Sequence, residues 1–487
     1  MAATRTPGTA TPSGTTSALR PIGIGPCFGI NMGSGWGKLY AVFEPDEEAA
    51  RVAAETAKAT KDTAPDGIAG PTENELEVVF PAMIGEAGDA EGSIARVDTV
   101  AWDKLYVVGE DALARNPRTM PAQARLQDDD FLPIMTRGAF AKLMKLSLAR
   151  IEVLITQEMF RLRGESAPPY SKLLADELER LRGVRFDPVK GEVGPISANV
   201  AETRSRPSKQ PYLGANLELE NQVRAKIVER EGRRGALPEQ VRGGWAVTGL
   251  PASWIDVPGY QSLLGKRLRA GAPGITRMRS IAEPLAILYS LALNGNGEEI
   301  NPALMTGRYG FVDMGFLTVD VDEVFNMRPQ EDGRDTWDLG AAGPVGQIRR
   351  MLHAHFDTPF EPFEVEMAIQ TGKIKVGGKM RDLPNHWDEP LNRQGRTIRD
   401  RLVHKWRSGG QFDAIFLGGG WAAEERIIAP ILTTFGNAQG VQRSQTSIAR
   451  GYAYLARRQA AEDAIKNAQK APRIAVPPAL MAETAGV

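Results

Sequence analysis

Two short glycine-bearing segments, far apart along this chain of 487 residues, share one local pattern. Their sequences are NMGSGWGK at residues 31–38 and DMGFLTVD at residues 313–320. Each lies between two apolar runs, so we predict a strand, a tight glycine turn and a second strand at both places. Glycine lets the backbone N–H groups of such a turn approach an anion without a side chain in the way. Two such hairpins can hold one polyphosphate from both sides, which indicates a nucleotide-binding cleft between two similar domains.

Length and composition are those of a globular protein with more than one domain. A chain of 487 residues exceeds what a single hydrophobic core supports, so we expect at least two domains. Charged residues make up 24% of the chain, an ordinary value, and the formal net charge is −1. This balance argues against a protein that coats nucleic acid by itself, although it leaves room for a local basic face.

Several classes of protein are disfavoured by what the sequence lacks. Cys27 is the single cysteine, which excludes an intramolecular disulfide and a cysteine-based metal site. The best apolar run, residues 285–293, is about half as long as a membrane-spanning helix needs to be. The first 20 residues have no apolar segment of the kind that a secretory signal contains, so we expect a cytoplasmic protein without a membrane span.

Between its ends the chain alternates short strand-like runs with helical patterns, which favours an α/β fold. Residues 1–20 and 471–487 are rich in small residues and proline, and we predict disordered tails there. Residues 164–213 break the alternation with polar, proline-rich stretches around a charged helical piece. We interpret residues 151–240 as an insertion, part helical and part mobile. A small independent domain is the alternative, but it would have few apolar residues for a core.

Five segments together carry a resemblance to a known superfamily. They are residues 29–42, 247–251 (VTGLP), 281–284 (IAEP), 313–320 and 415–420 (IFLGGG). In this order they resemble the actin-like ATPases, the superfamily that joins actin, DnaK-type chaperones and sugar kinases. Two further segments, residues 368–374 (AIQTGKI) and 449–452 (ARGY), resemble the bacterial plasmid-segregation branch, the ParM/StbA and Alp proteins. A lone glycine turn is weakly specific, whereas five segments in order are hard to obtain by chance.

The resemblance implies the actin-like ATPase fold, an α/β fold with two ribonuclease-H-like domains around a nucleotide cleft. Domain I would comprise residues 21–300, with the insertion at about 151–240 inside it. A C-terminal helix, residues 445–468, would return to domain I. Domain II would comprise residues 301–444.

The resemblance also implies which residues bind ATP and Mg²⁺. The nucleotide-binding positions are Asn31, Gly33, Ser34, Gly35, Gly37, Lys38, Gly315, Phe316, Leu317, Thr318, Asp320, Gly418, Gly419 and Gly420. Lys38 can reach the β- or γ-phosphate as a point charge. Mg²⁺ keeps several waters and needs only one or two carboxylates, so Asp313 is expected to hold it through a metal-bound water, with Asn31 as the second such position.

Two of these residues carry open questions. Glu283 is a candidate catalytic residue beside Asp313, because it could orient the attacking water; equally, an acid at a helix N-terminus favours the helix dipole. The family normally has Asp where this chain has Asn31. An amide can bind a metal-bound water but contributes no charge, which puts the rate of hydrolysis in doubt more than nucleotide binding. The alternative is that Asp313 and the phosphates suffice.

The predicted function is an ATPase that forms nucleotide-dependent filaments and segregates plasmid or other DNA. Its partners would be further copies of itself and a DNA-binding adaptor protein, with no direct contact to nucleic acid. The main alternative is a non-polymerising or slow-turnover ATP-binding scaffold of the same fold. A DnaK-type chaperone would need a substrate domain after residue 458, and a sugar kinase a second pocket with a catalytic Asp, which the sequence does not reveal.

Overall fold

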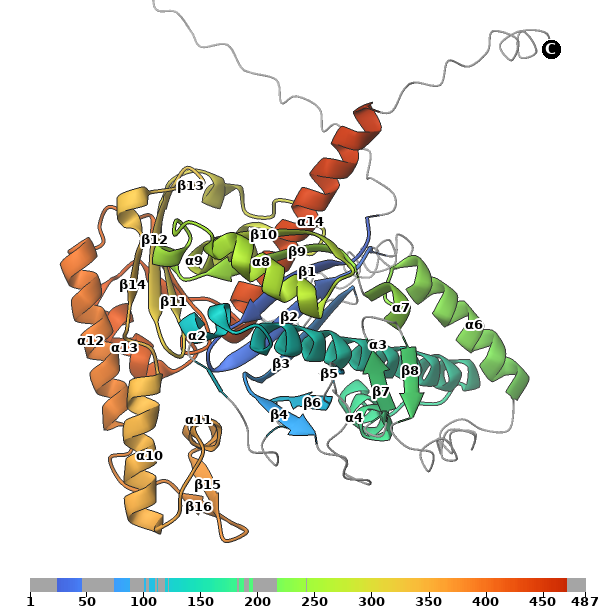
Figure 1. The fold of residues 1–487 in the computed structure, drawn as a ribbon, viewed down its shortest axis with the longest axis horizontal. Helices are drawn as coiled ribbons and strands as arrows, with labels where there is room; N and C mark the ends of the chain where they lie inside the picture. The colour runs from blue at the N-terminus through green and yellow to red at the C-terminus, as the bar shows by residue number, and fades with distance from the viewer. Residues whose placement is uncertain are drawn as a thin grey trace, which may run out of the picture.

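The computed structural model describes residues 24–45, 74–87, 100–101, 105–109, 112, 119–120, 122–181, 184–187, 192–195, 217–241 and 243–470. Two mixed β-sheets, each covered by helices, form two lobes that lie side by side (Figure 1). The two predicted tails lie outside the described residues. No helix in the described ranges has the length and apolarity needed to cross a membrane.

Lobe I is built on a five-stranded sheet with the order β10-β9-β1-β2-β3. Its first three strands, β1 (Cys27–Met32), β2 (Trp36–Val42) and β3 (Glu75–Pro81), are antiparallel neighbours. On the other side of β1, β9 (Gly244–Leu250) runs parallel to it and β10 (Ile275–Ala282) runs parallel to β9. The strands are rich in buried Val, Ile, Leu and Phe, as expected for a sheet covered on both faces.

Lobe II is built on a second sheet with the same topology. Here β11 (Arg308–Met314) pairs antiparallel with β12 (Val319–Phe325), and β12 pairs antiparallel with β13 (Arg328–Pro329) and β14 (Asp335–Trp337). On the other side, β17 (Ala414–Gly418) runs parallel to β11 and β18 (Ala438–Gly440) parallel to β17. The repeat of one strand order in both lobes confirms the predicted two-part α/β fold.

The helices divide between the two lobes, apart from α9 and α14, which also touch the second sheet. Those of lobe I are α2 (Ala122–Gln127), α3 (Phe131–Arg163), α4 (Tyr170–Arg180), α6 (Leu217–Arg233), α7 (Pro238–Val241), α8 (Tyr260–Gly271), α9 (Glu283–Ala292) and α14 (Ser444–Lys470). Those of lobe II are α10 (Ala342–Phe356), α11 (Pro362–Thr371), α12 (Glu389–Trp406) and α13 (Glu425–Thr434).

Several smaller elements stand outside the two main sheets. The short strands are β4 (Ile84–Ala87), β5 (Val100–Ala101), β6 (Leu105–Val108), β7 (Val184–Asp187), β8 (Glu192–Pro195), β15 (Lys373–Val376) and β16 (Lys379–Asp382). The 3₁₀ turns are η3 (Ala252–Trp254), η4 (Pro302–Met305) and η5 (Glu331–Gly333). Of these, η3 is important for the site, because it follows the parallel strand β9 directly.

The segment predicted as an insertion, residues 151–240, begins inside α3 rather than after it. The C-terminal part of this long helix contributes Ile151, Ile155 and Met159 to a small apolar cluster with Val223 and Ile227 of α6. α4 also packs against α3. The described part of the segment is therefore mostly helical, with one short hairpin, β7–β8, and α3 continues from the lobe into it without a break, as Figure 1 shows.

The last helix, α14, lies directly on the sheet of lobe I and contacts β1, β2, β9 and α9. Glycine makes this close approach possible. A Cβ atom on Gly29 of β1 would lie 1.8 Å from the carbonyl oxygen of Ala449, and one on Gly451 would lie 1.8 Å from the carbonyl oxygen of Ala286 in α9. A side chain at either position would clash with a backbone carbonyl oxygen and force the two packed elements apart.

We therefore expect Gly451→Ala to lower the free energy of unfolding by about 3 kcal/mol, because neither helix can move without disturbing the sheet. Gly346→Ala is the matched control. Gly346 is also inside a helix, but the nearest atom to its added Cβ would be the mobile guanidinium of Arg350 at 3.9 Å. That change should stabilise the protein by about 0.5–1 kcal/mol through helix propensity. Urea unfolding of both variants measures the difference, and equal effects would contradict this account of α14.

Candidate functional site

The two glycine turns predicted from the sequence are equivalent in the structure. In the first hairpin, β1–β2, Asn31 is the backbone partner of Lys38; in the second, β11–β12, Asp313 is the partner of Asp320. Both pairs are seven residues apart, so Asn31 and Asp313 hold the same place in their hairpins. A Cβ atom on Gly35 would lie 3.0 Å from the Cβ of Phe316, which shows that the two turns face each other.

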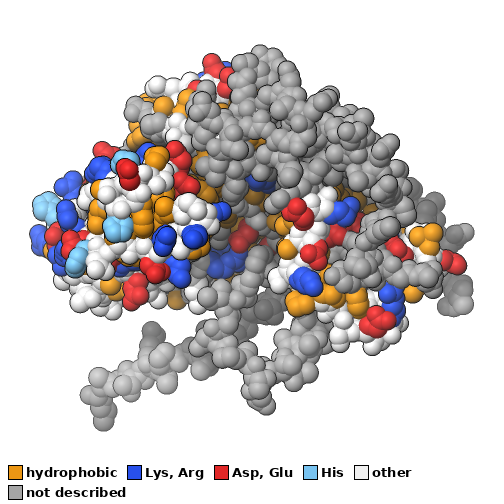
Figure 2. Space-filling view, turned by 90° about the horizontal axis from the view of Figure 1, so that it is seen from below, with side chains coloured by type: hydrophobic (Ala, Val, Ile, Leu, Met, Phe, Trp, Pro, Cys, Tyr) orange, Lys and Arg blue, Asp and Glu red, His pale blue; other side chains and the backbone are white. Residues whose placement is uncertain are grey.

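A cavity of about 240 Å³ lies between the two turns. Seen from below, acidic and basic side chains are visible in the hollow between the lobes (Figure 2). Most of the residues predicted to form the site line this cavity: Asn31, Gly33, Ser34, Gly35, Lys38, Glu283, Asp313, Gly315, Phe316, Leu317, Thr318 and Gly420. The cavity is completed by residues 248–251 at the end of β9, which include the predicted GLP segment.

Four predicted nucleotide-binding residues do not line the cavity, and they lie behind the residues that do. Gly37 packs against the Phe80 ring, and Gly418 packs against Ile287. Gly419 has a φ of +91°, and a Cβ there would lie 2.1 Å from Asp313 Oδ1, so only glycine leaves room for that carboxylate. Asp320 turns its carboxylate away from the cavity, toward donors described below.

Lys38 and Asp313 are buried in the cavity, and Glu283 is half-buried. Burial lowers the pKa of the Lys38 ammonium, while the carboxylates of Asp313, Glu283 and Glu366 oppose that change. Burial raises the pKa of Asp313, the nearby Asp320 charge adds to the rise, and Lys38 opposes it. The pKa of Glu283 is raised well above its ordinary value by burial and then by Asp313. A cation near Asp313 and Glu283 would favour their charged forms, and an anion near Lys38 would favour the charged ammonium.

The donor set fits a hydrated Mg²⁺ rather than an ion held by protein alone. Among the residues that the structure describes, no three His, Cys, Asp or Glu side chains converge on one point. Asp313 offers one buried carboxylate, and Asn31 offers an amide at the equivalent position of the first hairpin. Mg²⁺ is commonly bound through one or two carboxylates together with waters and substrate phosphates.

Arg125 of α2 is a residue of the site that sequence reasoning did not find. Its guanidinium is 1% exposed and donates to the carbonyl oxygens of Met32 at 3.2 Å and Ser34 at 2.8 Å, and also to that of Gly33. Burial lowers the pKa of Arg125 to about 9, so it remains a cation at neutral pH. Because a trans peptide points its C=O and N–H to opposite sides, holding these carbonyls turns the N–H groups of the loop away from Arg125. No motif in the sequence distinguishes this arginine.

Tyr452 of α14 is a second residue of the site to which sequence reasoning gave no role. It is fully buried, and its hydroxyl has no hydrogen-bond partner within the described part of the chain. A Cβ atom on Gly249 would lie 1.6 Å from the Tyr452 hydroxyl and 2.9 Å from Glu283 Cγ. Because Gly249 has no side chain, the Tyr452 hydroxyl and the Glu283 side chain can both lie close to it at the wall of the cavity. The sequence pointed to Tyr452 only through the resemblance of residues 449–452.

The first hairpin also reaches across to lobe II. The indole Nε1 of Trp36 donates to Glu366 on α11 at 2.8 Å, and the Trp36 ring lies 5.6 Å from the ring of Phe363. A second cavity of about 770 Å³ lies beyond this contact and shares Trp36, Gly420 and Trp421 with the first. Its polar lining residues include Gln370, Asn392, Glu424, Arg426 and Gln445. The two cavities together offer a charged compartment next to a larger, mixed one.

Residues 311–425 match the family model of the archaeal actin homologue MreB-like, C-terminal domain. This span begins on β11 and includes the second hairpin and β17. The match shows an actin-homologue domain within lobe II. The resemblance to the actin-like superfamily that the sequence motifs predicted is thereby confirmed, and so is the predicted fold.

Several solved structures are similar to this chain, and no curated protein sequence matches it. An archaeal actin homologue, Ta0583, in complex with ADP is 12% identical with a TM-score of 0.43, covering 90% of this chain and 99% of that one. A ParM filament from Clostridium botulinum is 14% identical with a TM-score of 0.46, covering 89% and 99%. The MamK double helical filament is 13% identical with a TM-score of 0.46, covering 88% and 98%.

The buried carboxyl group of Glu366 predicts a specific dependence of stability on pH. Burial raises its pKa to about 7, with the Trp36 hydrogen bond and Lys38 opposing the rise. Because the folded-state pKa lies above the unfolded value, the favourable contribution is fully present below about pH 4.5 and is lost as the pH rises through 7. Glu366→Gln keeps an acceptor for Trp36 and removes this loss.

In the nucleotide-free protein, Glu366→Gln should therefore raise the free energy of unfolding by about 1–3 kcal/mol at pH 8 and by much less at pH 5. The matched control is Glu364→Gln on the same helix, because Glu364 is exposed and Gln can replace it in the capping box. Urea unfolding at both pH values measures the difference. The same pH dependence in wild type and Glu366→Gln would contradict the assignment.

Proposed function

We propose that this actin-like protein binds ATP with Mg²⁺ in the cleft between its lobes, hydrolyses it, and forms cytoplasmic filaments whose assembly depends on the nucleotide. The observation that carries the proposal is the pair of equivalent glycine hairpins facing each other across a cavity that contains Lys38, Asp313 and Glu283. Two hairpins of this kind match a polyphosphate, since each presents backbone N–H groups and one adds an ammonium.

The two adjoining cavities suit the two parts of a nucleotide. Phosphates fit the charged cavity, where Lys38 supplies a positive charge and the Ser34 and Thr318 hydroxyls lie in the lining. The nucleoside fits the larger cavity, which continues past Gly420 and Trp421. Gly420, the last glycine of the run after β17, lines both cavities, which supports a nucleotide-binding role for it.

Asp313 would hold Mg²⁺ through the waters of the ion, with Asn31 as the second contact. The ion would neutralise charge on the transferred phosphoryl group, and phosphoryl transfer depends mostly on such neutralisation and on positioning. Glu283, a second carboxyl group of the cavity, would orient the attacking water molecule. Lys38 would hold the phosphates.

The filament and its task rest on the resemblance to the plasmid-segregation actins. Partners under this proposal are further copies of the chain and a DNA-binding adaptor, since a net charge of −1 gives no reason to expect direct binding to DNA. A slow-turnover ATP-binding scaffold is the second candidate. It is favoured by one specific observation, that Asn31 stands at the position equivalent to Asp313 and so leaves the site with one carboxylate fewer.

Right-angle light scattering with MgATP against MgADP tests the proposal. We expect scattering to rise with MgATP and to stay low with MgADP. Lys38→Ala should weaken ATP binding at least tenfold in calorimetric titration, by removing a charge from the phosphates, and Asp313→Ala should mainly slow hydrolysis. Lys266→Ala, at an exposed position on α8, is the control and should change neither. Unchanged affinity in Lys38→Ala would disprove the site, whereas tight binding without scattering would favour the scaffold.

Asn31 provides a further prediction about turnover. A second carboxylate beside Asp313 would hold the hydrated ion more firmly and fix which waters face the phosphate. We expect Asn31→Asp to increase steady-state ATPase activity several-fold, equivalent to about 1 kcal/mol of barrier, with a smaller change in ATP affinity. The assay should span several Mg²⁺ concentrations, because without bound metal the added charge repels the phosphates. Lower turnover at saturating Mg²⁺ would show that the Asn31 amide does not slow hydrolysis.

A further inference from the structure

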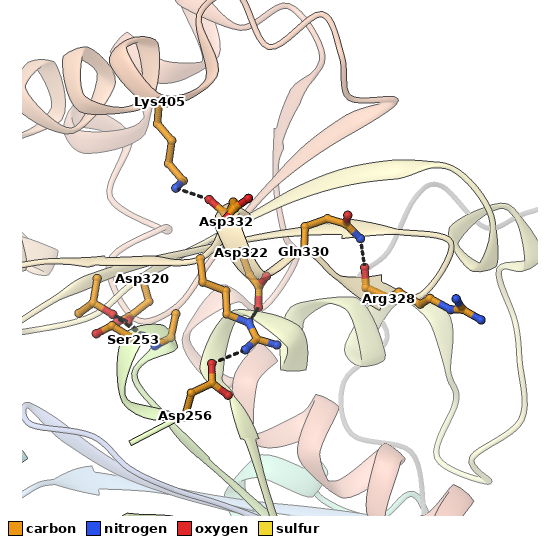
Figure 3. Close-up of polar contacts among 11 residues, drawn as sticks. Ser253, Asp256, Asp320, Asp322, Arg328, Gln330, Asp332 and Lys405 are labelled. Atoms are coloured by element: carbon orange, nitrogen blue, oxygen red, sulfur yellow. Dashed lines mark hydrogen bonds and ion pairs between the residues drawn. The ribbon is translucent and has the colours of Figure 1, made fainter. Parts of the chain in front are cut away.

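The carboxylate of Asp320 lies at a junction between the two lobes. It is 1% exposed and accepts three hydrogen bonds from three different elements. The Thr318 hydroxyl donates to Oδ2 at 2.8 Å, while the Thr336 hydroxyl and the backbone N–H of Ala252 donate to Oδ1 at 2.6 and 2.8 Å. Figure 3 shows Asp320 beside Ser253, whose own N–H donates to the Thr336 hydroxyl at 3.0 Å.

The donors connect opposite walls of the nucleotide cavity. Thr318 belongs to the turn of the second hairpin and lines the cavity from lobe II. Ala252 begins η3 in lobe I and follows directly after Leu250 and Pro251, which line the cavity from the other side. Asp320 itself lies behind the lining. One buried carboxylate therefore joins a phosphate-facing residue of lobe II to the wall supplied by lobe I.

A second contact ties the same segment of lobe I to the same strand. Asp322, two residues further along β12, is fully buried and forms an ion pair with Arg334 Nε at 3.4 Å. Arg334 also donates from Nη1 to Asp256, just after η3, at 2.8 Å (Figure 3). Asp256 is 75% exposed, so this outer ion pair is weak compared with the buried hydrogen bonds of Asp320.

The chemistry of the Thr318 hydroxyl makes the junction responsive to a ligand. A hydroxyl has one proton and donates to one acceptor at a time. In this structure the acceptor is Asp320. A phosphate oxygen that takes the Thr318 proton must remove it from Asp320, which leaves the buried carboxylate with the donors from Thr336 and Ala252. A buried carboxylate that loses a donor gains from drawing the remaining ones closer.

We propose that Asp320 is a positioning residue that couples the second phosphate hairpin to residues 249–256 of lobe I, through exchange of the Thr318 hydroxyl between Asp320 and a phosphate. This inference rests on the proposed function, because it needs a phosphate at Thr318. Binding of a polyphosphate then tightens the contact between Asp320 and the start of η3, so that residues 249–256 of lobe I respond to the occupied hairpin of lobe II.

Hydrogen exchange of the backbone amides with and without MgATP tests the coupling. In the wild type, MgATP should slow exchange at residues 249–254 by at least about fivefold, in line with typical coupling between sites. In Asp320→Asn the slowing at 249–254 should fall below about twofold, while residues 315–317 stay protected by MgATP and affinity changes less than tenfold. Asp256→Asn removes only the outer ion pair and should behave as the wild type.

A second pair of variants keeps the test decisive if Asp320→Asn does not fold. Thr318→Val removes the exchanging hydroxyl and should abolish the response at residues 249–254, whereas Thr318→Ser should restore it. An undiminished response in Asp320→Asn or Thr318→Val would overturn the proposal, as would a loss of affinity above a hundredfold in Asp320→Asn, because Asp320 would then contact the nucleotide itself. A wild-type protein that shows no MgATP binding in calorimetry overturns the proposed function, and this inference with it.

Discussion

The structure depends on one electrostatic arrangement, the burial of the Lys38 ammonium among carboxyl groups that different parts of the fold supply. Lys38 comes from the first hairpin, Asp313 and Glu366 from lobe II, and Glu283 from the start of α9. A buried charge is costly unless opposite charge accompanies it. The two lobes must therefore meet at this point, because the buried Lys38 ammonium and the buried carboxyl groups compensate each other only there. The cavity that can take an anion and a cation lies where they meet.

The two hairpins have the same register but hold their turns in different ways. In the first, the guanidinium of Arg125 donates to successive carbonyl oxygens of the loop. In the second, backbone N–H groups at the start of α10 donate to the carbonyl oxygens of the turn. Gly340 N donates to the Leu317 carbonyl at 3.0 Å, and Ala342 N donates to the Phe316 carbonyl at 2.7 Å. A side chain in one lobe and a helix N-terminus in the other thus fix equivalent loops, which is what an anion-binding turn requires.

This difference makes the pseudo-symmetric site chemically asymmetric. The first hairpin carries Lys38 and the neutral Asn31, while the second carries Asp313 and Asp320 at the same places. Of the two hairpins, the one in lobe I therefore contributes positive charge and the one in lobe II contributes negative charge. A nucleotide with its metal ion matches that division, because phosphates and cation carry opposite charge. The Asp320 junction behind the second hairpin then connects this asymmetric cavity to the rest of lobe I.

Much of the candidate site could be predicted from the sequence, because its central parts are local. A glycine turn between two apolar strands specifies its own hairpin, so residues 31–38 and 313–320 indicated both turns, and with them Lys38 and Asp313. The alternation of strands and helices likewise indicated an α/β fold, and the order of the motifs indicated its superfamily. These features depend on residues close together in the chain, where backbone geometry and side-chain periodicity act directly.

Residues whose roles depend on distant partners could not be predicted from the sequence and are revealed by the packing of the fold. Arg125 is about 90 residues from the carbonyls it holds, and Glu366 is 330 residues from Trp36. Asp320 fitted the phosphate motif in sequence, yet its carboxylate lies behind the cavity because Ala252, Thr318 and Thr336 together satisfy it there. No local pattern encodes such contacts. The two glycine hairpins are thus encoded locally in the sequence, whereas the packing of the lobes sets which residues support them and how they are connected.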